Sequence, residues 1–78
     1  MGGGSARRGL GDILRERRLG AGINERAMSL ALRRSSSFVR AYERGKVSLT
    51  IEELENVAAI LGTQLSELVA EYDNVKNQ

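Results

Sequence analysis

Helical periodicity is the feature that most constrains this chain, because apolar residues recur every three or four positions and never alternate long enough for a strand. The clearest example lies between Thr50 and Gly62. Its apolar residues at helical spacing are Ile51, Leu54, Val57, Ala58 and Leu61. Thr50 followed by Glu53 has the form of a capping box, and Gly62 permits a left-handed end. This segment is therefore predicted to be a helix with a continuous apolar stripe, the clearest helix in the chain.

Four other stretches show the same spacing. They predict helices over residues 7–19, 25–32 and 36–44, and a fifth that begins near Leu65 and fades into the polar residues 73–78. The inward-facing residues expected on these four helices are Leu10, Ile13, Leu14, Met28, Ala31, Leu32, Val39, Tyr42, Leu65 and Leu68. Good N-cap residues, Asn24 and Ser35, precede the second and third helices.

The connections between these helices are only two to six residues long. The sequence therefore predicts an all-α fold, a compact five-helix domain over residues 9–72. A glycine-rich stretch, residues 1–8, is expected to be a flexible arm, and residues 73–78 are expected to form a polar tail.

Composition excludes several classes of function. The chain has no histidine and no cysteine, so the usual ligands of a metal site and the usual bases of a catalytic site are missing. Its serines and carboxylates have no base partner at a recognisable spacing. We therefore expect no enzyme, no metal and no cofactor. No apolar run approaches the roughly 20 residues that span a bilayer, and no secretory signal is visible, so a cytoplasmic location is expected.

Charge is distributed unevenly along the chain. Residues 1–46 carry eleven basic and four acidic side chains, a net charge of +7, whereas residues 47–78 carry one basic and six acidic side chains, a net charge of −5. The basic half is the candidate surface for a polyanion such as nucleic acid. The alternative is a solvated surface with no partner, and charge alone does not decide between them.

The second and third predicted helices are short and lie about three residues apart. That spacing suits two helices that cross steeply, the helix-turn-helix arrangement, whose second helix enters the DNA major groove. Small hydroxyl residues at the start of that helix, Ser36 and Ser37, would allow a close approach to DNA. Neighbouring arginines such as Arg34 would neutralise phosphate charge. The alternative for the three serines is an N-cap, Ser35, followed by a solvated turn.

Three stretches of the chain resemble the Cro/repressor-type helix-turn-helix family, also called the XRE family. They are "LGDILRERR", "GINERAMSLALRRSSSFVRAYERGK" and "SLTIEELENVAAILGTQLSELV". The resemblance implies a lambda-repressor-like, DNA-binding transcription regulator of bacterial or phage type. It also implies a homodimer on double-stranded DNA with a palindromic operator. The stretch "GKVSLT" lacks a proline that many relatives carry, which resembles the restriction-modification controller branch.

The resemblance also implies roles for individual residues. Those expected to contact DNA are Arg34, Ser36, Ser37, Arg40, Ala41, Arg44 and Lys46. Arg18 and Glu43 match positions that often form a partly buried ion pair between the first and third helices; exposed charges are the alternative.

Three residues depart from the family pattern. Glu25 stands where relatives usually have a glutamine that meets the DNA backbone, and the adjacent Arg26 is a candidate to neutralise it. Arg33 replaces a turn glycine, which implies either a positive φ or a changed turn. Ser29 replaces an alanine at the helix crossing. These departures leave open that the fold is kept while DNA binding is weakened.

Two hypotheses of function follow. The first is a sequence-specific DNA-binding regulator, with Leu49, Ile51, Val69 and Tyr72 as the candidate homodimer interface. For Tyr72, the alternative is that it only covers the core of its own domain. The second hypothesis is a protein-binding helix-turn-helix module, antiactivator-like or antitoxin-like, which docks a protein regulator through the acidic C-terminal half and does not read DNA.

Overall fold

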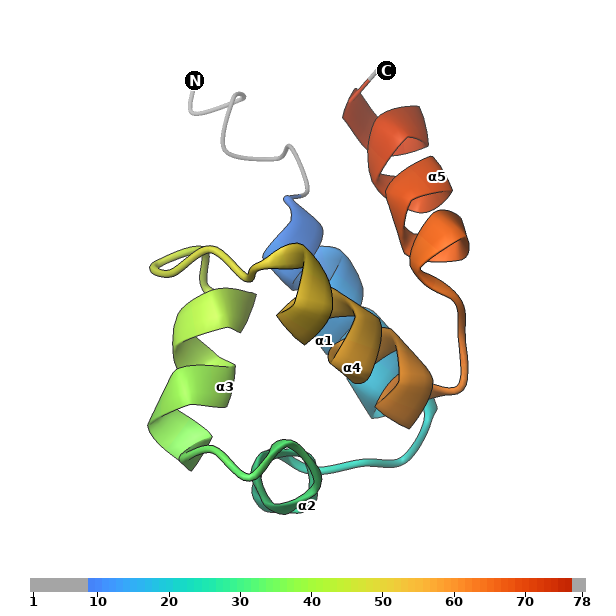
Figure 1. Ribbon diagram of the computed structural model, residues 1–78. Coiled ribbons are helices and arrows are strands. Elements are labelled where there is room, and N and C mark those ends of the chain that lie inside the picture. Colours follow the sequence, from blue (N-terminus) through green and yellow to red (C-terminus); the bar gives the residue numbers. More distant parts are fainter. Residues whose placement is uncertain (1–8, 77–78) are drawn as a thin grey trace.

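The computed structural model describes residues 9–76, which form five helices (Figure 1). The helices are α1 (Leu10–Gly20), α2 (Glu25–Leu32), α3 (Ser36–Glu43), α4 (Ile51–Leu61) and α5 (Leu65–Lys76). The predicted all-α fold is confirmed, and the predicted bounds of α2 coincide with the observed ones. None of these helices has the length and apolarity needed to cross a lipid bilayer.

Side-chain caps fix where three of the helices begin. The Asn24 side chain accepts a hydrogen bond from the Ala27 N–H at 2.8 Å, and Ser35 Oγ accepts one from the Phe38 N–H at 3.1 Å. At α4 the capping box is complete. Thr50 Oγ1 accepts from the Glu53 N–H at 3.1 Å, and the Glu53 carboxylate accepts from the Thr50 N–H at 2.8 Å. These polar groups satisfy backbone donors that a helix start would otherwise leave unpaired.

The first and last helices differ from their predicted bounds. Gly9 is extended, with its N–H bonded to the Asp12 carboxylate at 3.0 Å, so α1 begins at Leu10. The predicted start at residue 7, like the predicted arm over residues 1–8, lies outside the described residues. At the other end, α5 continues through Lys76 because Val75 still packs against the core. Residues 73–76 of the predicted tail are therefore helical.

One buried cluster joins all five helices. Its members are Ile13, Leu14, Met28, Val39, Tyr42, Leu54, Val57, Ala58 and Leu68. One inward position predicted from periodicity is wrong, because Ala31 is exposed. Ser29 is buried in α2 instead, and its hydroxyl donates to the Arg26 carbonyl oxygen at 2.7 Å.

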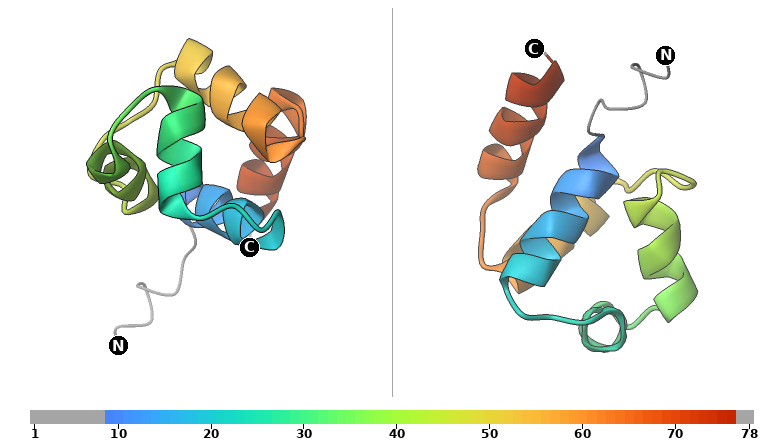
Figure 2. Two further views of the ribbon diagram at one scale, coloured as in Figure 1. Left: turned by 90° about the horizontal axis from the view of Figure 1, so that it is seen from below. Right: turned by 180° about the vertical axis from the view of Figure 1, so that it is seen from behind.

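The helices α1 and α4 lie between α3 on one side and α5 on the other, and α2 crosses beneath them (Figures 1 and 2). In agreement with these views, α3 packs on α1 and α2, whereas α5 packs on α1 and α4. The α2–α3 pair is therefore presented on a different side of the domain from α5.

Burial of Tyr42 gives a testable pH dependence. Desolvation, and then the negative charge of Glu43, raises the pKa of Tyr42 to about 12. In the unfolded chain a tyrosine ionises near pH 10, so unfolding becomes easier once the pH exceeds about 10. We expect Tyr42 to make its full contribution to the free energy of unfolding below pH 10, and we expect this contribution to be lost as the pH rises toward 12.

In a Tyr72→Phe variant Tyr42 is the only tyrosine. Its phenolate absorbance should then appear with a midpoint near pH 12, and ionisation near pH 10 in a folded protein would contradict the assignment.

Candidate nucleic-acid interface

A tight turn joins α2 to α3 at Arg33 and Arg34. Arg33 has φ 59° and ψ 39°, so it adopts the left-handed conformation that the sequence left as one of two possibilities. The turn closes as the Arg33 N–H bonds to the Leu30 carbonyl oxygen and the Arg34 N–H bonds to the Ser29 carbonyl oxygen, at 3.2 and 3.0 Å. A glycine would adopt this conformation without the strain of a Cβ atom. Arg33 therefore has the left-handed conformation at the position where the resemblance implies a glycine.

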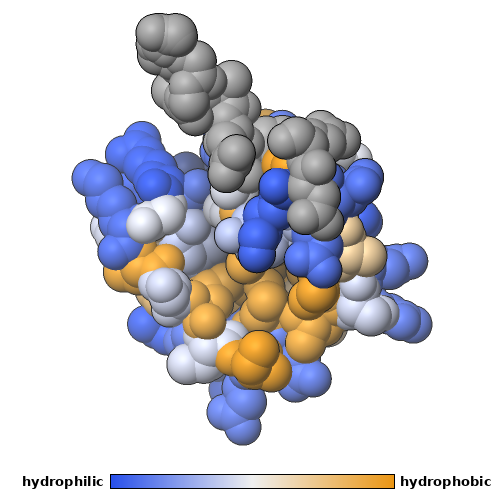
Figure 3. All heavy atoms as spheres, turned by 90° about the horizontal axis from the view of Figure 1, so that it is seen from above, coloured by the Kyte–Doolittle hydropathy of each residue, from blue (hydrophilic) through white to orange (hydrophobic). Residues whose placement is uncertain are grey.

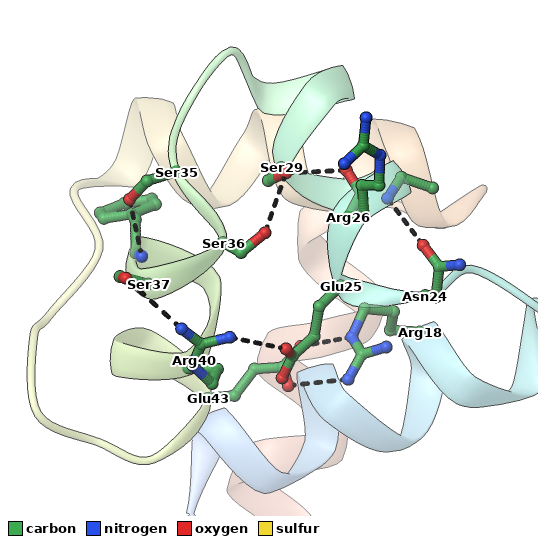
Figure 4. A network of polar contacts seen from close by, with 12 residues as sticks. Arg18, Asn24, Glu25, Arg26, Ser29, Ser35, Ser36, Ser37, Arg40 and Glu43 are labelled. Atoms are coloured by element: carbon green, nitrogen blue, oxygen red, sulfur yellow. Dashed lines mark hydrogen bonds and ion pairs between the residues drawn. The ribbon is translucent and has the colours of Figure 1, made fainter.

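The three serines of this turn have different positions (Figure 4). Ser35 caps α3. The partly buried Ser36 points back toward α2, where its hydroxyl lies 3.4 Å from Ser29 Oγ. Ser37 is exposed on the first turn of α3. Of the two serines predicted to contact DNA, Ser37 lies on the open surface and Ser36 lies at the helix crossing.

Arg40 forms an ion pair with Glu25 across the two helices. Arg40 Nη1 lies 3.1 Å from the Glu25 carboxylate, and Arg40 Nη2 lies 3.4 Å from Ser37 Oγ. Figure 4 shows the guanidinium between these two partners. The sequence hypothesis that Arg26 neutralises Glu25 is wrong at this point, because the ion pair is made by Arg40.

Arg34 is held against α3 and α4. Its guanidinium carbon lies 3.8 Å from the centre of the Phe38 ring, and its Nη1 lies 3.1 Å from the Glu53 carboxylate. The backbone N–H of Thr50 first, and Arg34 in addition, lower the pKa of Glu53. The Arg34 side chain thus links the helix-turn-helix unit to the start of α4 while it stays about half exposed.

The remaining predicted DNA contacts lie at the end of α3 and in the loop after it. Ala41 is partly buried, whereas Arg44 and Lys46 are exposed. Gly45, with φ 76°, turns the chain, and the Lys46 N–H bonds back to the Ala41 carbonyl oxygen at 2.8 Å. The loop therefore presents two cations directly beside the C-terminal end of α3.

Arg18 and Glu43 fix this unit to α1. Arg18 Nε and Nη2 lie 2.7 and 3.1 Å from the two carboxylate oxygens of Glu43, and both side chains are at most 5% exposed. Arg18 Nη1 also donates to the Ile23 carbonyl oxygen at 2.9 Å, just before α2. The hydrogen bond to Glu43 raises the pKa of Arg18. One guanidinium therefore connects α1, the segment before α2, and the end of α3.

The four residues predicted to form a dimer interface divide into two pairs. Leu49 and Tyr72 are partly buried, pack against the core, and line a pocket of about 380 Å³. Ile51 and Val69 are 66% and 47% exposed. Figure 3, the view from above Figure 1, shows hydrophobic side chains gathered across the middle of that face. Tyr72 therefore packs on the core of its own chain, and Ile51 and Val69 are the two of these four residues with exposed side chains.

Within residues 9–76 the structure contains no group of three His, Cys, Asp or Glu side chains that could hold a metal ion.

Comparison with known proteins shows which family has this arrangement of helices. The family described as Helix-turn-helix matches residues 14–68. The crystal structure of the clp gene regulator ClgR from Corynebacterium glutamicum superposes with a TM-score of 0.81 and 29% sequence identity. This match covers 87% of this chain and 72% of ClgR.

The protein HppE contains a similar domain. Apo-HppE matches with a TM-score of 0.72 and 30% identity over 81% of this chain and 35% of HppE. The FeII HppE structure with substrate has the same TM-score and identity and is covered over 37% of its length. This chain thus spans about a third of HppE, and the iron and substrate belong to that protein. No curated protein sequence matches the chain.

Proposed function

This chain belongs to the Cro/repressor-type (XRE) helix-turn-helix family of DNA-binding transcription regulators, and from that premise we propose that it binds a palindromic operator as a homodimer. In this proposal α3 enters the major groove. The observation that carries it is the placement of Ser37 and Arg40 together on the open surface of α3, beside the cations of the following loop. A non-enzymatic role in the cytoplasm is part of the same proposal.

Each side chain has a task that follows from its position. Arg40 is long enough to make a bidentate contact to the O6 and N7 atoms of a guanine, with Ser37 beside it. Arg44, Lys46 and the half-exposed Arg34 bind phosphates and fix the register of the domain on the duplex. Ser36 and Ala41 border this surface, and Ser36 also permits the close crossing of α2 and α3.

Selection of bound sites from random duplex DNA, read by sequencing, tests the proposal. We expect a palindromic consensus whose binding weakens as salt rises. Arg40→Ala should weaken binding to this site by about 5- to 100-fold and relax the preference at one base pair in each half-site, while the fold stays intact. Arg15→Ala removes an exposed arginine from α1 and is the matched control. Equal affinity and equal base preference in Arg40→Ala and wild type would remove Arg40 from the recognition surface.

Assembly is tested separately, since one short recognition helix discriminates poorly and two half-sites about one helical turn apart overcome this. We propose that the exposed Ile51 and Val69, together with the partly buried Leu49 and Tyr72, contact the second copy. Val69→Asp should convert the dimer to a monomer in sedimentation and weaken operator binding, with helicity unchanged. Leu19→Asp introduces the same charge at an exposed leucine at the end of α1 and is the control. A wild-type protein that stays monomeric at high concentration and on its DNA site would refute the dimer.

One observation favours a second candidate, a protein-binding module of antiactivator-like or antitoxin-like type. Two of the arginines on the helix-turn-helix unit, Arg34 and Arg40, are paired with carboxylates of the same chain, which reduces the positive charge available to DNA. In this case the partner is a protein regulator that binds the acidic C-terminal half. Failure of the wild-type protein to select any duplex at low salt would favour this candidate.

A further inference from the structure

Glu25 is an unusual side chain to find beside a surface proposed to meet DNA. It is the first residue of α2, and its carboxylate lies 3.1 Å from Arg40 Nη1 on α3. A carboxylate near phosphates is repelled by them, so Glu25 weakens any contact that Arg40 could make to the DNA backbone. Its presence therefore needs an explanation other than general affinity for nucleic acid.

The geometry leaves Arg40 able to bind a base. The side chains of Arg40 and Glu25 are 43% and 36% exposed, so the pair lies at the surface and solvent reaches it. A guanidinium has five N–H donors in a planar fork. Glu25 accepts from one donor of Arg40, and Ser37 lies 3.4 Å from the other terminal nitrogen, so donors remain for a further acceptor. Because both terminal nitrogens of Arg40 have a partner, its guanidinium can adopt fewer orientations than that of an unpaired surface arginine.

The negative charge of Glu25 discriminates between the two kinds of acceptor that DNA offers Arg40, the phosphates and the guanine bases. A phosphate is an anion, and the adjacent carboxylate opposes its approach to Arg40. The O6 and N7 atoms of guanine belong to a neutral base, so this repulsion is much smaller. An unpaired arginine would contribute affinity for every duplex, because neutralising a phosphate needs no particular sequence.

From these contacts we propose that Glu25 is a specificity-determining positioning residue, which holds Arg40 for guanine and prevents it from binding phosphate. The inference rests on the proposed function, since it assumes that α3 meets DNA. Glu25 acts through Arg40 and does not itself contact a base. Its effect is to lower affinity for unrelated DNA and to raise the ratio of specific to non-specific affinity.

The experiment compares wild type with Glu25→Gln on two duplexes, the selected site and an unrelated sequence, over a series of salt concentrations. Glutamine keeps the size of the side chain and removes its charge. We expect Glu25→Gln to bind the unrelated duplex more tightly and with a steeper salt dependence, by about one unit of slope, because Arg40 gains a phosphate. The specificity ratio should fall about tenfold, within the discrimination that one bidentate contact supplies.

Two controls separate positioning from net charge. Glu55→Gln removes an exposed carboxylate from α4 and should leave the specificity ratio unchanged. In an Arg40→Ala background, Glu25→Gln should also leave the ratio unchanged, because the residue through which Glu25 acts is gone.

The experiment distinguishes failure of the Glu25 inference from failure of the proposed DNA-binding function. If wild type selects no duplex, the DNA-binding proposal fails, and this inference fails with it. If wild type is selective but Glu25→Gln keeps the same specificity ratio and the same salt slope, only the role of Glu25 is overturned. A fall in the ratio that persists in the Arg40→Ala background would also overturn it, because Glu25 would then act without Arg40.

Discussion

Gly11→Ala is expected to lower the free energy of unfolding by about 2–3 kcal/mol, the upper part of the range for an added methyl group that a packed crossing cannot accommodate. A Cβ atom at Gly11 would lie 2.4 Å from the Glu43 carbonyl oxygen and 2.6 Å from the Tyr42 carbonyl oxygen. Both are backbone atoms, so α1 and α3 would have to move apart. Denaturant unfolding followed by circular dichroism measures the loss.

Gly20→Ala is the matched control for this substitution. Gly20 also belongs to α1, but a Cβ atom there meets nothing within 4 Å. Alanine favours a helix over glycine, so this variant should equal wild type or exceed it by at most about 1 kcal/mol. Equal stabilities of Gly11→Ala and Gly20→Ala would show that the two helices do not depend on the close approach at Gly11.

Glu43→Ala is expected to destabilise the domain by about 3–5 kcal/mol, because it leaves the Arg18 guanidinium buried without its carboxylate. Arg18→Ala should have a similar effect, since it leaves the Glu43 carboxylate buried without its cation. Because the partners share one interaction, the double variant should lose less than the sum of the two single losses in a denaturant cycle. Strictly additive losses would contradict the coupling.

An exposed ion pair provides the comparison. Arg17 on α1 lies 3.0 Å from the Glu71 carboxylate on α5, with its side chain 38% exposed. Pairs of this kind contribute at most about 1 kcal/mol, because water screens the charges. Arg17→Ala should therefore cost far less than Arg18→Ala, although the two arginines are neighbours in the sequence.

Local chemistry explains which parts of the fold could be predicted from the sequence. Each cap that places the start of α2, α3 or α4 acts over three residues, so Asn24, Ser35 and Thr50 identify these starts without tertiary information. The predicted burial of Ala31 is wrong because burial depends on which helix lies opposite, and Ala31 lies on an exposed side of α2.

The contacts within the candidate site could not be predicted from the sequence, because they depend on how the helices are placed relative to one another. Ser29, a polar residue, is buried in α2 because its hydroxyl bonds within its own helix and its small size suits the crossing with α3. The Glu25–Arg40 pair joins residues fifteen positions apart on two helices. The order of charges along the sequence does not reveal the angle at which α2 and α3 cross. The sequence therefore suggested the adjacent Arg26 as the partner of Glu25.

The left-handed conformation of Arg33 has a consequence for how this domain can change. A non-glycine residue with this φ costs about 1 kcal/mol relative to glycine. Every arginine codon becomes a glycine codon by one base substitution at its first position, so relief of this strain lies a single mutational step away. That step would also remove a positive charge from the turn that leads into α3. At position 33, therefore, glycine would give the more stable domain and arginine gives the more strongly cationic one, and a single residue cannot provide both.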